Sequence, residues 1–207
     1  KNAKGLPELY CLDYGYWWIE LGGDSGDIIG KSEDIRNELI KCIWGIWDHL
    51  KNGGDHGAEN FELVWTGIIP GTRESRRLVG DVMLNENDIM SNRIFDDAVA
   101  YGGWPMDVHT PGGIKDTEKY PSTIYHFDGL YTIPYRCFYS KNIENLMMAG
   151  RNISATKLGM SSARVMGTCA VGAQAAGTAA AFCIKRELTP RELGNKYIRE
   201  LQQLLIK

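Results

Sequence analysis

The stretch SSARVMGTCAVGAQAAGTAAAFC, residues 161–183, decides the interpretation of the fold because it predicts a helix with few large side chains. From Val165 to Ile184 there is no charged residue, and glycine and alanine outnumber the large hydrophobic residues. Gly172, Ala176 and Ala180 recur on one helical face, so another element or a flat ligand can approach the backbone closely. Since nearly all faces carry small residues, we predict that this helix is enclosed by the rest of the protein.

The composition of the whole chain excludes several classes of protein. With 207 residues, 43% hydrophobic and 24% charged, it is typical of a soluble globular protein of one or two domains. A net charge of −3 gives no attraction to phosphate backbones, so we expect no nucleic-acid partner. The small-residue helix has the length of a membrane span, about 20 residues, but it is only weakly hydrophobic, and we expect no span. The five cysteines lack CxxC spacing, so we expect no metal centre built from neighbouring ligands.

In the first half of the chain, the sequence predicts a strand, a helix and two further strands. Alternating aromatic and apolar residues predict a strand over residues 12–21. Residues 32–51 have helical spacing, with Ser32 as the expected cap and a glycine pair after Lys51. Residues 61–69 alternate as a strand, and residues 76–84 are its expected partner.

The second half predicts short elements that lead to the small-residue helix. Asn85 is expected to cap a helix from Glu86 to about Ile94. Residues 104–109 predict a strand, residues 110–122 a polar loop, and residues 124–140 two short strands. After the helix, the sequence TPREL predicts the start of a final amphipathic helix.

A buried strand, a loop and a helix follow one another around Gly150. The apolar strand over residues 145–150 ends at this glycine, and the small-residue helix is expected to begin near Ser161 or Ser162. The start of such a helix directs free backbone N–H groups and a positive dipole toward one point, where an anion or an electron-rich carbonyl can bind. Many α/β loops share this order for packing alone, so a structural role is the alternative.

The sequence NLMMAGRNISATKLGMSSARVMGTCAVGAQAAGTAAA, residues 145–181, resembles the C-terminal signature of the FAD-dependent oxidoreductases among the glutathione-reductase-like flavoproteins. Five upstream blocks are similar to that family as well: YWWIELGG, DIRNELIKCIWGIWDHLKN, RESRRLVGDVMLNENDI, AVAYGGWPMDVH and YTIPYRC. The resemblance covers most of residues 10–185.

The resemblance implies an α/β fold with two parts. Residues 1–140 would form part of an α+β substrate or cap domain, and residues 141–207 the last part of a split, Rossmann-like FAD-binding domain. The family's GxGxxG phosphate loop is absent from this sequence, so the ADP half of FAD is expected to bind a preceding N-terminal part of the same polypeptide. We therefore expect that these 207 residues alone do not hold FAD.

The resemblance also implies which residues approach the cofactor. Gly150 and Arg151 would lie beside the ribityl or pyrophosphate portion of FAD, although many relatives carry an acid where Arg151 stands. The pyrimidine edge of the isoalloxazine would face the helix start, formed by Ser162, Ala163, Arg164, Val165 and Met166. Backbone N–H groups there would stabilise the negative charge of the reduced flavin. A bulky residue at Ala163 or Gly167 is expected to abolish flavin binding.

His109 and Arg136 are the candidates for substrate chemistry. His109 follows Asp107 on the same face of the predicted strand, so the pair can pose an imidazole as a proton acceptor; a hydrogen-bonded structural histidine is the alternative. Arg136 can bind a carboxylate or an oxyanion, or form an ion pair. We expect the two residues to share one wall of the flavin cavity.

The expected activity is hydride transfer between flavin and a small organic substrate, for which the aromatic-rich composition suggests a sugar or polyol. Two other functions stay open: a non-catalytic, glycan-binding module that retains the fold, and an iron–sulfur-linked electron carrier. The sequence assigns no cellular compartment.

Overall fold

The computed structural model describes residues 18–53, 56–73 and 75–206. The chain divides into two compact units, one with residues 1–72 and 109–123, the other with residues 73–108 and 124–207. The predicted domain boundary between residues 140 and 141 falls inside the second unit, so the assignment of a cap domain and an FAD domain stays a prediction.

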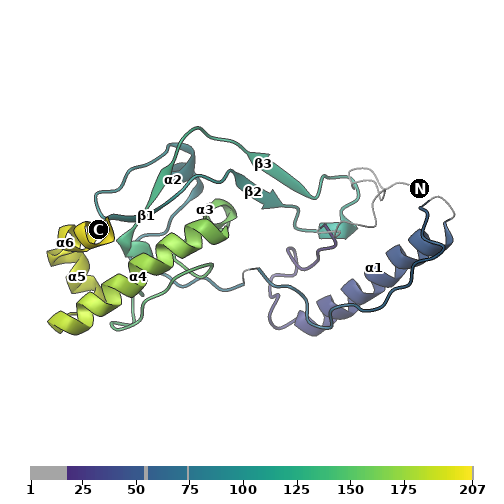
Figure 1. The fold of residues 1–207 in the computed structure, drawn as a ribbon, viewed down its shortest axis with the longest axis horizontal. Helices are drawn as coiled ribbons and strands as arrows, with labels where there is room; N and C mark the ends of the chain where they lie inside the picture. Colours follow the sequence, from purple (N-terminus) through teal and green to yellow (C-terminus); the bar gives the residue numbers. More distant parts are fainter. Residues whose placement is uncertain (1–17, 54–55, 74, 207) are drawn as a thin grey trace. The chain divides into compact units, whose positions relative to one another are not determined.

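The first unit contains one long helix, α1, Ser32–Asn52 (Figure 1). Glu33 and Asp34 lie in its first turn and Lys51 lies in its last, where each charge interacts favourably with the helix dipole. The helix is confirmed, but its cap is not: Ser32 is the first helical residue, and the cap position belongs to Lys31, without a side-chain hydrogen bond.

The two strands predicted for the first unit are not found among its described residues. Residues 12–17 of the first lie outside the described part, and residues 18–21 form no strand. Instead, the carbonyl of Glu20 accepts a hydrogen bond of 3.0 Å from the N–H of Ile114, which lies in the 3-10 helix η1, Gly113–Lys115. Residues 61–69 are also irregular, and Val64, Trp65 and Ile69 are exposed. Alternation makes a segment suitable for a strand but does not supply a partner backbone.

Within the described residues, four short strands form two two-stranded sheets. In the second unit, β1, Ala98–Gly102, pairs antiparallel with β4, Tyr131–Pro134, with an irregularity between Ala98 and Ala100. The other sheet joins β2, Met106–His109, to β3, Ser122–Tyr125, and both of these strands cross the division between the units. The expectations of a strand within 104–109 and of two short strands near 124–140 are confirmed, whereas β1 was not predicted.

The segments 76–84 and 145–150 are not regular strands. Residues 76–84 run beside residues 152–155 instead of residues 61–69: Leu78 donates its N–H to Asn152 at 3.0 Å, and Leu84 donates to Ser154 at 3.1 Å. Residues 145–150 form only an isolated bridge between Met147 and Tyr139. The fold is therefore mixed α/β with small antiparallel sheets, and a Rossmann-like sheet stays a proposal.

Three short α-helices and one 3-10 helix of the second unit are described in addition to the helices of the small-residue segment. Helix α2, Glu86–Met90, begins at the predicted cap Asn85 but ends earlier than expected. Helix α5, Pro190–Lys196, begins with a capping box between Thr189 and Glu192, as TPREL predicts. The final helix is interrupted at Tyr197, after which α6, Ile198–Leu205, follows. The short 3-10 helix η2, Tyr135–Cys137, follows β4.

The small-residue segment forms two helices instead of one. Helix α3, Lys157–Ala163, contains the serines at which the helix was expected to begin. After a break at Arg164 and Val165, the long helix α4, Met166–Arg186, packs against β1, α5 and α6 (Figure 1). The predicted helix start was therefore wrong by about one turn.

Only one face of α4 is enclosed in the described structure. Its buried residues are Thr168, Gly172, Ala175, Ala176, Ala179, Phe182 and Cys183. A Cβ added at Gly172 would lie 2.7 Å from the ring of Phe138, so glycine is needed for this close approach. The opposite face is exposed at Met166, Ala170, Ala173, Gly177, Ala181 and Ile184, which corrects the expectation of a fully enclosed helix. By length and composition alone α4 also passes as a membrane-spanning helix, but core helices of globular proteins pass the same test.

Candidate functional site

The first turn of α4 presents unsatisfied backbone donors. The residue before it, Val165, has an extended backbone and an apolar side chain that cannot accept a hydrogen bond. The first intrahelical bond runs from the N–H of Cys169 to Val165, so the N–H groups of the preceding turn have no acceptor within the helix. Met166 is 89% exposed, and a Cβ at Gly167 would meet nothing within 4 Å. The positive end of a 21-residue helix therefore faces open space.

Buried residues of helix α3 support the start of α4. Ser162 donates from its hydroxyl to the carbonyl of Trp104 at 2.5 Å and accepts from the hydroxyl of Tyr131 at 2.8 Å. Burial raises the pKa of Tyr131 to about 12, which keeps this phenol protonated at neutral pH. Ser162 and Ala163 are both buried in α3, so they pack one turn before the exposed donors.

Arg164 ties the junction between α3 and α4 to strand β2. Its Nη2 donates to the carbonyl of Asp107 at 3.0 Å and to the Asp107 carboxylate at 3.2 Å. The arginine side chain is only 11% exposed. Asp107 was also expected to pose His109, and that role stays a prediction beside its contact with Arg164.

The turn at Gly150 and Arg151 was also expected to approach the cofactor. Gly150 has a φ of +87° and no neighbour that a Cβ would meet within 4 Å, so its left-handed backbone is what requires glycine. Burial raises the pKa of the Cys169 thiol, and the positive charge of Arg151 acts in the opposite direction. Arg151 is thus near enough to the first turn of α4 to influence a side chain there.

His109 forms a dyad with a residue that the sequence analysis missed. Its Nδ1 lies 2.6 Å from a carboxylate oxygen of Glu20, which is 89 positions away in the chain. A carboxylate accepts only, so Nδ1 donates and the ring is held in one orientation. The His109 side chain is 14% exposed. An imidazole oriented by a carboxylate is the usual arrangement of a general base.

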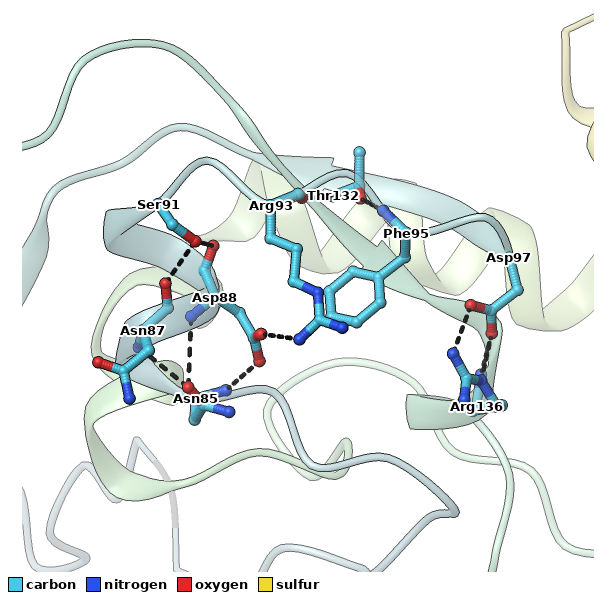
Figure 2. A network of polar contacts seen from close by, with 9 residues as sticks. All are labelled: Asn85, Asn87, Asp88, Ser91, Arg93, Phe95, Asp97, Thr132 and Arg136. Carbon is cyan, nitrogen blue, oxygen red and sulfur yellow. Dashed lines mark hydrogen bonds and ion pairs between the residues drawn. The ribbon is translucent and has the colours of Figure 1, made fainter.

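The alternative interpretation of Arg136 was a buried ion pair. An ion pair does form, but the arginine side chain is 45% exposed. Located in η2, it donates from Nε and Nη2 to the two carboxylate oxygens of Asp97, both at 2.9 Å (Figure 2). This bidentate contact raises the pKa of the guanidinium. His109 and Arg136 belong to different units, so their common wall and the substrate-binding role of Arg136 stay predictions.

The neighbouring polar network in Figure 2 holds α2 in place. Asn85 accepts from the backbone of Asn87 and Asp88, and Asp88 accepts from the backbone of Asn85 at 3.1 Å and from Arg93 at 2.8 Å. The Arg93 guanidinium also lies over the ring of Phe95, 4.3 Å from its centre. These contacts satisfy one another, and we assign them a structural role.

Comparison with known proteins identifies the family. A family model described as FAD dependent oxidoreductase matches residues 6–205, nearly the whole chain. The chain belongs to the FAD dependent oxidoreductase family. Searches of the curated proteins and of the solved structures found no match.

Membership of the FAD dependent oxidoreductase family implies FAD as the cofactor. The residues at the start of α4 fit the flavin part of that group on two observations. The N–H groups without an acceptor in the helix can donate hydrogen bonds to an electron-rich ring edge. The open space at Gly167 allows a flat ring to approach the backbone closely. For the ADP part, the sequence contains no GxGxxG motif.

Proposed function

We propose that this FAD dependent oxidoreductase transfers a hydride between FAD and a small organic substrate, with the flavin bound at the start of α4. The proposal rests mainly on the exposed first turn of α4, whose N–H groups have no side-chain acceptor at the cap position Val165. When bound, FAD supplies the chemistry of hydride transfer.

The residues of this chain have distinct roles in that proposal. The backbone N–H groups of Met166 and Gly167 hold the pyrimidine edge and stabilise its negative charge in the reduced state. Arg164 fixes their position through Asp107. Gly150 and Arg151 contact the ribityl or pyrophosphate portion. Ser162 and Ala163 keep the helix start in place from the buried side, which replaces the direct contact that the resemblance implied for them.

The ADP half of FAD requires a second part of the site. We propose that an N-terminal part of the same polypeptide holds it, because these 207 residues contain no glycine-rich phosphate loop. The exposed face of α4 supports this proposal, since its row of small residues allows a neighbouring layer to pack closely.

His109 is the proposed base for the substrate. Oxidation of an alcohol to a carbonyl removes a hydride from carbon and a proton from oxygen, and the imidazole is assigned that proton. Glu20 orients the ring through Nδ1. A sugar or polyol suits this chemistry. Exposed Tyr101 and Trp104 support such a substrate, because aromatic rings pack well against sugar faces. The backbone carbonyl of Trp104 also accepts a hydrogen bond from the α3 residue Ser162.

A matched pair of glycine substitutions tests the flavin position. In the full-length enzyme, Gly167→Leu fills the space assigned to the ring edge, whereas Gly45→Leu changes an exposed glycine of helix α1 with equally open surroundings. We expect the first variant to lose bound flavin and the second to retain it, as measured by flavin absorbance after purification. Equal flavin content in both variants would contradict the proposed site. A wild-type enzyme without flavin absorbance would favour a non-catalytic binding module instead.

A further inference from the structure

Two histidines meet at the end of α1, in a part of the molecule that the proposed chemistry does not use. The Nε2 atoms of His49 and His56 lie 3.0 Å apart. Their rings are arranged edge to face, with centroids 4.8 Å apart and an interplanar angle of 68°. We propose that His49 and His56 form a two-imidazole binding site for a divalent transition-metal ion of the Cu²⁺ or Ni²⁺ type.

The separation of the two nitrogens suits adjacent positions in a metal coordination sphere. Imidazole nitrogens bind these ions at about 2.0–2.1 Å, so two ligands at a right angle are about 2.9 Å apart. A tetrahedral angle would separate them by about 3.3 Å. The observed 3.0 Å between the Nε2 atoms therefore favours square-planar or octahedral ions, for which imidazole is a suitable ligand.

The segment that carries His56 is held on α1 by contacts independent of the imidazoles. The ammonium of Lys51 donates to the carbonyls of Ala58, Glu59 and Phe61, at 3.3, 2.6 and 2.7 Å. Ala58 and the α1 residue Leu50 are both buried. Because residues 58, 59 and 61 are held on Lys51 without metal, less conformational entropy is lost when a metal ion brings the two histidines together.

The site is accessible, and it has room for water as the remaining ligands. His49 is exposed and His56 is half-buried. Across residues 18–53, 56–73 and 75–206, no group of three or more His, Cys, Asp or Glu side chains is arranged to hold a metal ion. The competing state is a hydrogen bond between the two rings, in which one Nε2 donates. Metal binding requires that the donor ring move its proton from Nε2 to Nδ1.

Calorimetric titration with Ni²⁺ tests the proposal on the 207-residue chain, purified without added histidines. The wild type is expected to bind one equivalent. His49→Gln and His56→Gln should each weaken binding on the order of a hundredfold, because a chelate becomes a single ligand. The matched control is His126→Gln, which removes an exposed histidine elsewhere in the chain and should bind as the wild type does.

Two results would overturn the metal site and leave the pair as a hydrogen bond. One is a wild type that binds no equivalent of Ni²⁺, and the other is unchanged binding in both pair variants. If a variant loses its helical circular dichroism and so does not fold, the metal site is judged from the wild type alone. Electron paramagnetic resonance of its Cu²⁺ complex is expected to show two coordinated nitrogens, and a spectrum without nitrogen coupling would contradict the assignment.

Discussion

His109 and Glu20 are joined by a short contact of 2.6 Å. In the full-length enzyme, His109→Gln is expected to lower kcat by about a hundredfold or more, because the proton acceptor is lost while the flavin site is intact. Glu20→Gln should lower kcat less, since the ring remains but its orientation is no longer fixed. The measurement is steady-state oxidation with flavin content determined in parallel.

The control for this dyad is His126→Gln, which should leave kcat unchanged. Wild-type turnover in His109→Gln would assign the histidine a structural role. Loss of flavin in that variant would equally speak against a role in proton transfer.

Asp81 links stability to pH through its contact with Arg191. The guanidinium donates to both carboxylate oxygens at 2.8 Å and, with a smaller contribution from the Tyr139 hydroxyl, lowers the pKa of Asp81. The native state thus binds fewer protons than the unfolded state, so this stabilisation is present above about pH 4 and is lost as pH falls through the native pKa.

Urea unfolding at about pH 6 and about pH 2.5 measures this effect. We expect the free energy of unfolding of the wild type to fall more between these two pH values than that of Asp81→Asn or Arg191→Gln. Each variant lacks the ion pair that acid breaks. An identical loss in all three proteins would show that the ion pair does not contribute.

At the scale of elements, two glycines of α4 should respond in opposite ways to alanine. Gly172→Ala places a Cβ against the buried ring of Phe138 and is expected to lower the free energy of unfolding by about 1–3 kcal/mol. Gly177→Ala meets nothing within 4 Å and should raise it by about 0.5–1 kcal/mol through helix propensity. Thermal and urea unfolding report both, and a stabilised Gly172→Ala would mean that α4 does not approach Phe138 this closely.

The cap of α2 offers a second element-scale test. Asn85→Ala removes the acceptor for two backbone N–H groups and should cost about 1 kcal/mol of unfolding free energy. Asn87, on the exposed side of the same helix, contributes to α2 through its backbone N–H and carbonyl, which Asn87→Ala keeps, so this variant should change stability by less than about 0.5 kcal/mol. Equal losses in the two variants would argue against the cap.

Local signals explain which elements the sequence predicted correctly. The cap at Asn85, the capping box in TPREL and the helical spacing of residues 32–51 depend on neighbours within one or two turns. Strands depend on a partner backbone, and so the alternation of residues 61–69 was insufficient. The break at Val165 was hidden because Ser161 and Ser162 are good cap residues whose side chains bond elsewhere.

The family signature indicated a segment for the candidate site, but it did not indicate the partners of the side chains. It points to Gly150, Arg151 and the residues before Met166, and their place beside a flavin stays a prediction. Spacing along β2 suggested that Asp107 poses His109, but it indicated neither the contact of Asp107 with Arg164 nor that of His109 with Glu20. Such pairings depend on long-range contacts that no local pattern specifies.

At the scale of the whole molecule, the family match extends over both units of the chain. The elements that hold the start of α4, namely α3 and β2, come from separate parts of the sequence. The described fold thus provides a helix start and its support, and the part that holds the ADP half of FAD stays a proposal.

The most direct test of this account is a crystal structure of the full-length enzyme with FAD bound. We predict that the pyrimidine edge of the flavin lies within hydrogen-bonding distance, about 3 Å, of the backbone nitrogen of Met166 or Gly167. A flavin bound elsewhere, with the first turn of α4 open to solvent or covered by protein alone, would contradict the account.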